Sequence, residues 1–483
     1  MISSCTQEQS FGFDRLVGFM TYDVIIIGSG PGGYVAAIRA AQYGCKVAVV
    51  ERAAAFGGTC LHVGCIPTKA LLHFADSYET VVNGKHIGIN TKEVTLDFSL
   101  MQQRKRQIIE GHARGIQLLF RKNKIESIAG FGRLMGDGRV EVESTDERHE
   151  LKADNIVLAT GSEAKRLPGI NLPSGCLLTN VEILNLETIP KSLAIVGAGA
   201  VGVEFASIYR SFGSDVTILE ALPRLVPLED EEISKELARA FLRRNIQIHT
   251  GAVIDSVEQA SDGVAINFTA EGNDAQQMSA EKVLLAVGRT PNTEKIGLEN
   301  TSIQTEKGFI KTDSYMQTAE QGVYAIGDIV ADTPQLAHVA SMEGIVAATR
   351  IAGQDVEPIN RHHSPAATYC EPQIGSVGFT EAVARKMGYA VKVGKFSFRG
   401  NSKSSILGRH DGFVKVIAEE ETEEILGVHI IGPQATELIS EAVVAMSSEA
   451  TADSIARTIH SHPTLSEAVQ EAFQGVYGMT INS

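Results

Sequence analysis

One sequence pattern occurs twice in this chain of 483 residues, and it constrains the fold more than any other feature. In each copy an apolar run is followed by a turn of the form Gly-x-Gly-x-x-Gly, a helical stretch, a second apolar run and a glutamate. The glutamate follows the first glycine after 23 positions in both copies, from 28 to 51 and from 197 to 220. The residues of the two copies are Gly28, Gly30, Gly33 and Glu51, and then Gly197, Gly199, Gly202 and Glu220. The pattern predicts two strand–helix–strand units, each part of a parallel sheet.

Each part of the pattern has a physical task in binding a dinucleotide. The first glycine makes a tight turn, the second lets a pyrophosphate approach the backbone, and the third lets helix and strand pack closely. The helix N-terminus offers free N–H groups to the phosphates, and the glutamate accepts hydrogen bonds from a ribose. A single copy would also suit a purely structural turn, whereas two copies at equal spacing favour two bound dinucleotides. We therefore expect an α/β fold with two Rossmann-like domains.

The glutamate of the second copy also bears on the choice of nicotinamide cofactor. Glu220 pairs well with the ribose 2′-hydroxyl of NAD but repels the 2′-phosphate of NADP, which favours an arginine. Arg224 follows closely, so NADP stays open as an alternative. The sequence favours NAD.

Length and composition indicate about three folded domains, at roughly 100–200 residues each. A hydrophobic fraction of 43% excludes a disordered or fibrous chain. A net charge of −15 argues against a nucleic-acid partner, and no apolar run approaches the ~20 residues that span a bilayer. Six cysteines are too few for a disulfide-framework secreted domain. Residues 1–20 lack the pattern of a signal or transit peptide, so we expect an N-terminal tail and a cytoplasmic location.

Two cysteines, Cys60 and Cys65, lie within the stretch GGTCLHVGCIPTKALLH. On a regular helix their Cα atoms would be too far apart for a disulfide, whose limit is about 7 Å. Gly64 and Pro67 are placed to distort that turn, and a helix N-terminus with Lys69 favours negative sulfur. Buried structural thiols or half of a metal site are alternatives, but zinc usually takes four ligands and there is no second cysteine pair. The pattern favours a redox-active disulfide with no bound metal.

The cysteine stretch resembles the active-site motif of the pyridine nucleotide–disulfide oxidoreductases, a flavoprotein family. The resemblance runs from Thr21 to about Gly475 and includes the segments VLATGS, LLAVGRTPN and GVYAIGD. It implies that the first glycine-rich turn holds FAD and the second holds NAD. The implied FAD residues are Gly28, Gly30, Gly33, Glu51, Gly58, Thr59, Lys69, Gly132, Thr160, Gly161, Ser162, Asp328, Gln335, Leu336, Ala337 and His338. The implied NAD residues are Gly197, Gly199, Gly202, Glu204, Glu220 and Gly288.

A further motif near the C-terminus, HSHPTLSE, resembles the segment that carries the family's catalytic base. Pro463 and Thr464 are expected to start a helix. His462 would then lie at the loop-to-helix junction with Glu467 about one turn in, where a carboxylate fixes the imidazole tautomer and raises its basicity. Read alone, such a histidine is more often a cap or a solvated group. The complete motif favours His462 over His460 as the base.

The resemblance implies an enzyme that oxidises dihydrolipoamide and reduces NAD⁺. His462 would take a proton from dihydrolipoamide, and the resulting thiolate would attack Cys60. Cys65 would remain as a thiolate against the flavin, with Lys69 and Glu204 near the flavin and the nicotinamide. The base would come from the second subunit of an obligate homodimer. The implied partner is a lipoylated acyltransferase of an oxoacid dehydrogenase complex, or a glycine-cleavage carrier protein.

The same resemblance implies a division of the chain into a tail and three domains. After the tail, a discontinuous FAD-binding domain would occupy 21–153 and 283–353. The NAD-binding domain would occupy 154–282 between these two parts. Residues 354–483 would form an α+β interface domain that carries the base.

Several observations leave room for other readings. Position 62 is His where family members usually carry Asn, and position 68 is Thr where many carry Ser; both could tune the redox pair. Reduction of mercuric ion or thioredoxin is disfavoured because no cysteine pair lies near the C-terminus, and Glu220 disfavours a glutathione reductase. A non-catalytic docking role is the alternative from another functional class.

The acidic run 229–232 is expected to be a solvated helix face.

Overall fold

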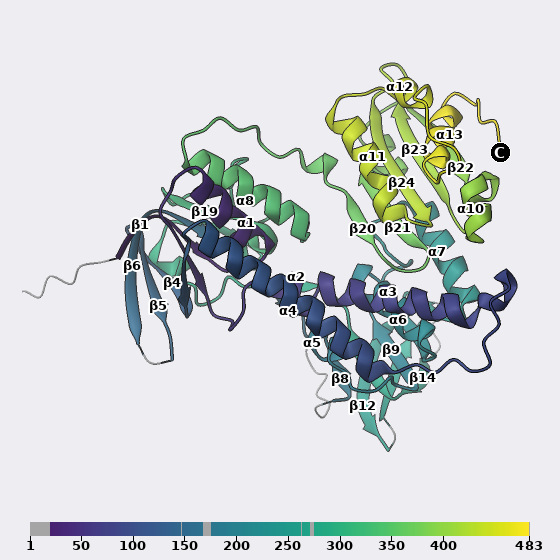
Figure 1. Cartoon of the computed structure of the whole chain (residues 1–483), viewed down its shortest axis with the longest axis horizontal. Helices are drawn as coiled ribbons and strands as arrows, with labels where there is room; N and C mark the ends of the chain where they lie inside the picture. The colour runs from purple at the N-terminus through teal and green to yellow at the C-terminus, as the bar shows by residue number, and fades with distance from the viewer. Residues whose placement is uncertain (1–19, 146, 168–174, 262, 271–274, 483) are drawn as a thin grey trace, which may run out of the picture.

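The computed structural model describes residues 20–145, 147–167, 175–261, 263–270 and 275–482. Of the predicted tail, 1–20, only Met20 belongs to this described part, and it begins the first strand. Figure 1 shows three bodies joined by long helices and extended segments. None of the helices in the described ranges is long and apolar enough to cross a membrane.

The first domain is built on a seven-stranded sheet. Its main elements are β1 (Met20–Ile27), α1 (Pro31–Gln42), β2 (Val47–Glu51), β3 (Glu126–Ala129), β4 (Phe131–Gly136), β5 (Arg139–Glu143), β6 (Arg148–Leu158), β19 (Val323–Ala325) and α8 (Ala337–Ile351). The strand order is β3-β2-β1-β6-β5-β4, and β19 also pairs with β6. Strands β1 and β2 run parallel, with Val24 opposite Val47, and their β-branched side chains are buried on both faces. The predicted strand–turn–helix–strand unit is therefore confirmed.

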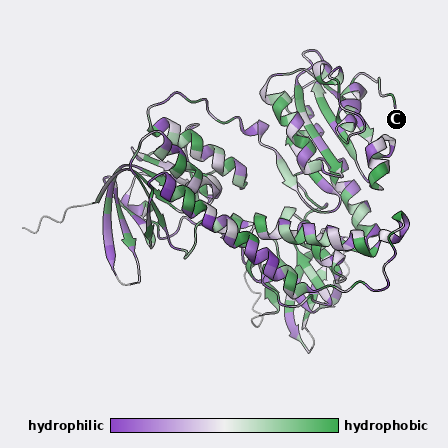
Figure 2. Ribbon diagram, viewed as in Figure 1, coloured by the Kyte–Doolittle hydropathy of each residue, from purple (hydrophilic) through white to green (hydrophobic). Residues whose placement is uncertain are grey.

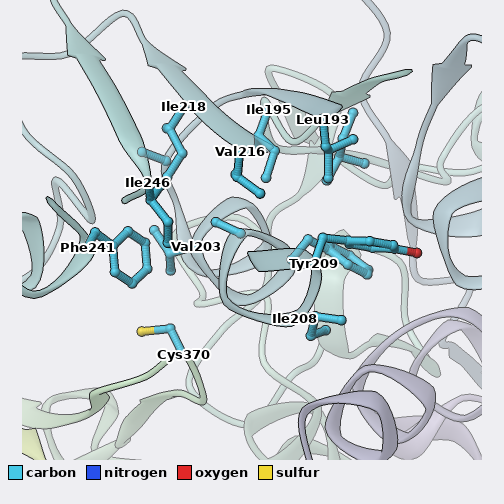
Figure 3. Close-up of a cluster of buried hydrophobic side chains, with 14 of the residues drawn as sticks. Leu193, Ile195, Val203, Ile208, Tyr209, Val216, Ile218, Phe241, Ile246 and Cys370 are labelled. Atoms are coloured by element: carbon cyan, nitrogen blue, oxygen red, sulfur yellow. The ribbon is translucent and has the colours of Figure 1, made fainter. Parts of the chain in front are cut away.

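The second domain repeats the same unit on a five-stranded sheet in the order β11-β10-β9-β15-β8. Its elements are β8 (Leu177–Leu178), α5 (Asn180–Leu184), β9 (Ser192–Val196), α6 (Ala200–Ser211), β10 (Asp215–Glu220), α7 (Glu231–Arg243), β11 (Gln247–Thr250), β12 (Val253–Ala260), β13 (Gly263–Thr269), β14 (Ala275–Ala280) and β15 (Lys282–Leu285). Figure 3 shows part of its core, in which Ile195 and Ile218 of the sheet lie above Val203 and Tyr209 of α6. Cys370 of the C-terminal domain reaches the same cluster, so the apolar core continues across the domain boundary.

The chain passes between the first two domains through a pair of short strands. These are β7 (Ser162–Ala164) and β16 (Arg289–Pro291), which pair antiparallel. Strand β6 stays in the first sheet as far as Leu158, and β15 stays in the second sheet as far as Leu285. The chain therefore leaves the first sheet after Leu158 and the second sheet after Leu285.

Three helices near the cysteine stretch connect the first two domains. They are α2 (Gly58–Val63), α3 (Cys65–Val82) and α4 (Phe98–Lys122). In Figure 1, α3 and α4 extend from the first domain across the second. Leu71 and Ala75 of α3 and Phe98 of α4 are buried in the core of the second domain. The start of α3 therefore lies between the first and second domains.

The C-terminal domain is an antiparallel sheet in the order β20-β21-β24-β23-β22, covered by helices. Its elements are β20 (Ala366–Thr368), β21 (Gln373–Gly378), α9 (Glu381–Lys386), β22 (Val391–Ser397), α10 (Ser402–Leu407), β23 (Phe413–Glu419), β24 (Ile425–Gly432), α11 (Ala435–Ser447), α12 (Ala452–Ala456) and α13 (Glu467–Gly475). The remaining short elements are η1 (Gly84–Ile87), η2 (Leu298–Asn300), β17 (Thr305–Glu306), β18 (Phe309–Ile310), η3 (Gly327–Ile329), η4 (Arg361–His363) and η5 (Phe398–Gly400). The strands of this sheet are largely hydrophobic in Figure 2, consistent with the α+β expectation.

The first half of the acidic run 229–232 is buried where two domains meet, which corrects the prediction of a solvated face for Glu229 and Asp230. The second half agrees with that prediction, since the side chains of Glu231 and Glu232 are 60% and 44% exposed. The side chains of Asp230 and Lys415 are each 3% exposed. The Lys415 Nζ lies 3.0 and 3.2 Å from the two Asp230 carboxylate oxygens and 2.8 Å from Glu381 Oε2. Glu229 is buried beside them. The prediction failed at these two residues because the lysine that pairs with Asp230 comes from β23, far along the chain.

Candidate active site

The two cysteines of the redox stretch lie on two consecutive helices. Cys60 belongs to α2 and Cys65 begins α3, with Gly64 between the helices at φ −141° and ψ −119°. A Cβ on Gly64 would lie 2.8 Å from the Thr59 carbonyl oxygen and 3.1 Å from the Cys60 Cα, so glycine permits this close approach. Pro67 lies in the first turn of α3, where an N–H is not needed. The predicted distortion is therefore confirmed at Gly64, whereas Pro67 fits a regular first turn.

The two thiols are free and interact directly, and their acidities differ. The hydrogen bond from the Cys60 thiol lowers the pKa of Cys65 to about 7, with burial opposing the shift and the Lys69 ammonium adding to it. The same hydrogen bond and burial raise the pKa of Cys60. Cys65 is therefore the sulfur that ionises first, while Cys60 keeps its proton.

Lys69 ties this redox pair to the second domain. Its Nζ lies 2.8 and 2.9 Å from the two carboxylate oxygens of Glu204 on α6. The Glu204 side chain is 5% exposed and also accepts a hydrogen bond from the Tyr369 backbone N–H at 2.9 Å. The ion pair thus lies close to Cys65 where the first two domains meet.

The first glycine-rich turn has the shape that a pyrophosphate requires. A Cβ on Gly33 would fall 2.0 Å from the Gly28 carbonyl oxygen, whereas one on Gly30 would meet no atom within 4 Å. Among the described residues no side chain caps α1 at Gly30, so its first N–H groups are available to a ligand. Glu51 Oε2 accepts hydrogen bonds from the Ser29 N–H at 2.9 Å and the Ser29 hydroxyl at 2.6 Å. These residues fit the diphosphate and ribose of FAD.

The second glycine-rich turn repeats this geometry. A Cβ on Gly202 would fall 2.0 Å from the Gly197 carbonyl oxygen, and one on Gly199 would meet nothing within 4 Å. Glu220 Oε2 accepts a hydrogen bond from the Ala198 N–H at 2.6 Å. Within the described chain no side chain caps α6 either. The turn fits a second dinucleotide, and the carboxylate lies where a ribose would be bound.

Three predicted flavin residues from separate segments lie together at the end of the first sheet. The Ser162 hydroxyl donates to the Asp328 carboxylate. Gln335 Nε2 donates to the Asp328 carbonyl oxygen at 3.2 Å. Arg289 Nε donates to Ser162 Oγ at 2.6 Å and lies 3.7 Å from the Asp328 carboxylate. The predicted Ser162–Asp328–Gln335 group is therefore brought together, with Arg289 as an added charge.

The other predicted cofactor residues lie around the two turns. Gly58 begins α2, and a Cβ on it would lie 2.7 Å from the Gly30 Cα. Gly132 lies in β4, where a Cβ would be 3.1 Å from the Ile27 side chain. The Thr160 hydroxyl donates to the Asn292 carbonyl oxygen at 2.7 Å. The remaining members are Thr59 in α2, Gly161 between β6 and β7, Gly288 before β16, and Leu336, Ala337 and His338 at the start of α8.

His462 and Glu467 form the predicted pair, but the helix begins later than expected. His462 Nδ1 lies 2.9 Å from Glu467 Oε1, and the His462 side chain is 69% exposed. Glu467 is the first residue of α13, so Pro463 and Thr464 lie in a turn before the helix. Glu467 Oε2 accepts the Thr464 N–H at 2.8 Å, which closes that turn. Burial acts to raise the pKa of Glu467, but the hydrogen bonds from Thr464 and His462 lower it.

His460, the competing base, is held at both ring nitrogens. Its Nε2 lies 2.6 Å from Glu441 Oε1 and its Nδ1 lies 2.9 Å from the Thr458 carbonyl oxygen. The hydrogen bond to Glu441 raises the pKa of His460. In the described part of the chain, His462 is bonded only through Nδ1. The geometry favours His462 as the histidine with a nitrogen free for a substrate.

One chain does not bring the base to the cysteines. Figure 1 places α13 in the C-terminal domain, well apart from α2 and the start of α3. The redox pair and the imidazole therefore lie in separate parts of one chain.

Sequence reasoning missed three residues that contribute to these sites. Ser29 lies between the glycines of the first turn, and a hydroxyl at that place was an available signal. Arg289 follows the predicted Gly288, and its charge was a weaker signal. Tyr369 gave no signal, because the groups that it contacts, Lys69 and Glu204, are distant in sequence.

Comparison with known proteins places these features in a family. Residues 22–344 match the model described as "Pyridine nucleotide-disulphide oxidoreductase", and residues 364–473 match the dimerisation domain of the same family. "Dihydrolipoyl dehydrogenase" of Bacillus subtilis is 44% identical over 95% of this chain and 99% of its own length. "Dihydrolipoyl dehydrogenase 3" of Pseudomonas putida is 42% identical over the same shares.

Solved structures agree with the sequence comparison. The crystal structure of LpdA from Mycobacterium tuberculosis has a TM-score of 0.87 at 26% identity, covering 94% of this chain and 99% of that one. The HOCl-induced flavoprotein disulfide reductase RclA from Escherichia coli, solved as a Cu(II) complex, has a TM-score of 0.84 at 25% identity over the same shares. The two glycine-rich turns, the paired thiols and the dimerisation domain thus have one explanation: the chain belongs to the pyridine nucleotide–disulphide oxidoreductase family.

Proposed function

We propose that this chain oxidises dihydrolipoamide to lipoamide and reduces NAD⁺, with Cys60 and Cys65 as the redox pair. The observation that carries the proposal is the pair of interacting thiols with unequal acidities beside Lys69. Relatives named dihydrolipoyl dehydrogenase match 95% of the chain at 41–44% identity, which supports this substrate over others of the family.

Two bound cofactors belong to the proposal. The fit of the first turn supports FAD in the domain built on β1, and that of the second supports NAD in the domain built on β9. Bound flavin and nicotinamide would supply a two-electron path between thiols and NAD⁺. Ser162, Asp328 and Gln335 would hold the flavin's sugar chain, and Glu220 would hold the ribose of NAD.

The protein's own residues account for the thiol chemistry. In the disulfide state, a substrate thiolate attacks Cys60; a new sulfur–sulfur bond forms and the Cys60–Cys65 bond breaks. The electron pair of the broken bond stays on Cys65, whose lowered pKa makes it the better leaving group. Lys69 stabilises that charge. The second substrate thiol then displaces Cys60 and closes the lipoamide ring, so that both cysteines are reduced.

His462 is proposed to remove the thiol proton. Its Nδ1 is held by Glu467, which leaves Nε2 to accept a proton from the substrate. The positive imidazolium is then stabilised by the same carboxylate. The dimerisation domain indicates a homodimer, and in it the partner subunit's His462 would face Cys60.

Three further parts of the proposal rest on the sequence. The lipoyl group would be presented by an acyltransferase of an oxoacid dehydrogenase complex or by a glycine-cleavage carrier protein. The C-terminal domain from about 354 onward would form the dimer interface, after a discontinuous FAD-binding domain and an inserted NAD-binding domain. The location is proposed to be the cytoplasm.

One assay and one spectrum test the proposal. Purified yellow protein should reduce NAD⁺ with dihydrolipoamide much faster than it reduces glutathione disulfide or mercuric ion with NADH. Anaerobic addition of dihydrolipoamide should produce a long-wavelength absorbance from the Cys65 thiolate against the flavin. A colourless protein after refolding with FAD, or no spectral change, would contradict the proposal and favour a docking role.

A further inference from the structure

The Lys69 ammonium lies where all three domains of the chain meet. Lys69 comes from α3, Glu204 from α6 of the second domain, and Tyr369 from the segment that follows β20 in the C-terminal domain. The Nζ is 2.8 Å from Glu204 Oε1 and 4.7 Å from the centroid of the Tyr369 ring. The cation therefore has a carboxylate and an aromatic ring as neighbours, both within favourable range.

The segment that carries the ring is fixed to α6 by hydrogen bonds at successive turns. The Tyr369 N–H donates to Glu204 Oε1 at 2.9 Å, and the Glu371 N–H donates to Ser207 Oγ at 3.0 Å. Arg244 Nη1 donates to both Ser207 Oγ and the Glu371 carbonyl oxygen at 3.3 Å. These contacts hold the backbone of the segment without using the Tyr369 side chain. Contacts between the C-terminal domain and the second domain thus fix the position of the ring beside Lys69.

The charge of Lys69 acts on the redox pair because Cys65 and Lys69 are four residues apart on one helix face. The groups around Cys65 are the Cys60 thiol, the Lys69 ammonium and the Glu204 carboxylate. Burial acts against the charged form of Lys69, but the charges of Glu204 and Cys65 raise the pKa of Lys69. A displaced ammonium would leave the Cys65 thiolate with the repulsion of Glu204 uncompensated.

We propose that Tyr369 is a positioning residue of the active site, whose ring face holds the Lys69 ammonium beside Cys65 and thereby stabilises the Cys65 thiolate. The role of that thiolate in dihydrolipoamide oxidation rests on the proposed function. The hydroxyl of Tyr369 is not needed for this role, since the contact is with the ring face. A phenylalanine at this position should therefore hold Lys69 as well as the tyrosine does. A ring whose face has lost electron density should hold it less well.

A set of side chains at position 369 tests the proposal, and the fluorinated members change the electron density of the ring while nearly keeping its shape. The variants are Tyr369→Phe, Tyr369→Leu, and phenylalanines with increasingly fluorinated rings introduced at the same position. Each holoenzyme is reduced anaerobically with dithiothreitol, and the pH midpoint of the long-wavelength thiolate–flavin absorbance is measured. We expect Phe to match the parent and the midpoint to rise with fluorination. Loss of the ring in Leu should raise it by about half a pH unit, or ~0.7 kcal/mol.

A second readout does not depend on the flavin. In flavin-depleted protein the rate of Cys65 alkylation by iodoacetamide, followed by peptide mapping, should show the same upward shift in its pH dependence. Thermal unfolding and FAD content of the fluorinated series should match the Phe variant, because the packing is unchanged. A midpoint that stays flat across the fluorinated series would overturn the proposal, whether or not the Leu variant shifts.

The test separates this inference from the proposed function. Dithiothreitol reduces the disulfide whatever the natural dithiol is, so the midpoint series remains valid if dihydrolipoamide is not a substrate. Absence of dihydrolipoamide turnover with a graded midpoint series would refute the substrate and support the role of Tyr369. Normal dihydrolipoamide turnover with a pH midpoint that does not change across the series would support the substrate and refute the role of Tyr369.

Discussion

The imidazole of His462 is held through Nδ1 by Glu467, the residue with which α13 begins, at a distance of 2.9 Å. The same carboxylate accepts the Thr464 N–H, so one side chain closes the turn and orients the ring. Because Nδ1 is occupied, Nε2 is the nitrogen that remains for a substrate. The ring is largely exposed in the single chain, so this nitrogen is open to solvent. Five predictions follow from this and the other contacts.

Replacing His462 by glutamine should remove most of the dihydrolipoamide activity. We expect a loss of about 10²–10⁴-fold in turnover, because a positioned proton acceptor contributes that much. Bound flavin and NADH oxidation by artificial acceptors should persist, since neither requires the imidazole. His460→Gln is the matched control and should lose far less, because Glu441 and Thr458 already occupy both nitrogens of His460. Equal losses in the two variants would remove His462 from the mechanism.

Subunits with complementary defects should restore activity when they are mixed. In a mixed dimer of Cys60→Ser and His462→Gln chains, one site carries both defects and the other carries neither. Random exchange of equal amounts should therefore recover about a quarter of the parental turnover. Subunit exchange is verified with differently tagged chains. No recovery after verified exchange would show that the base and the cysteines act within one chain.

Gly64→Ala should damage the redox turn. The added Cβ would lie 2.8 Å from a backbone oxygen and 3.1 Å from the Cys60 Cα, and neither can move without displacing α2. We expect about 1–3 kcal/mol of lost stability together with slower disulfide formation, measured by thermal unfolding and by timed thiol alkylation. Gly111→Ala is the control, because a Cβ there meets no atom within 4 Å and the site lies within α4. That change should leave disulfide formation unaltered.

Glu220→Ala should narrow the preference for NADH over NADPH. The carboxylate accepts N–H groups of Ala198 and Leu222 and would repel a 2′-phosphate. We expect the ratio of kcat/KM values for the two cofactors to fall by about tenfold, mainly through KM. Glu51→Ala removes the corresponding acid of the first turn and should weaken FAD retention without changing this ratio. An unchanged ratio in the Glu220 variant would refute the assignment of the second turn.

Glu229→Gln should stabilise the chain increasingly as the pH rises. Burial raises the pKa of Glu229 to about 7, and the hydrogen bond from Ser376 offsets this only in part. An unfolded glutamate releases its proton near pH 4.3, so between about pH 4.3 and 7 the folded chain binds more protons than the unfolded one. The contribution of this group therefore falls as the pH rises through that window.

The expected gain of the Glu229→Gln variant at pH 8 relative to pH 4 is about 3–4 kcal/mol. Thermal unfolding of parent and variant across this range measures it. Glu231→Gln, two residues further on, is the control, because Glu231 is exposed and pairs with Lys235 at the surface. If the difference in unfolding free energy between the Glu229 variant and the parent did not change with pH, the raised pKa of Glu229 would be contradicted.

Local patterns predicted the elements that local residues determine. The order of β1, α1 and β2 follows from a β-branched run, a glycine-rich turn and a second apolar run that ends at Glu51, and the structure confirms that order. The start of α13 was predicted too early, because the side chain of Glu467 holds the preceding residues in a turn. No propensity of the residues in HSHPTLSE reports that contact.

Contacts between distant segments account for what the sequence could not predict. Asp230 is buried because Lys415 lies opposite it, 185 residues further along the chain. A lysine inside the apolar strand Phe413–Glu419 was a signal of such a partner, but nothing indicated which acid it would meet. Tyr369 is similar, since its place beside Lys69 depends on how three domains pack.

The interruption between α2 and α3 has a mechanical consequence. Each sulfur is carried by its own helix, and the two helices meet at the single peptide unit around Gly64. Backbone rotation around Gly64 can bring the sulfurs together or apart. The rest of α3 meanwhile stays fixed to the second domain by the ion pairs of Lys69 and Glu79. A change in the distance between the two sulfurs thus requires rotation only in the backbone near Gly64, and the ion pairs of α3 can stay as they are.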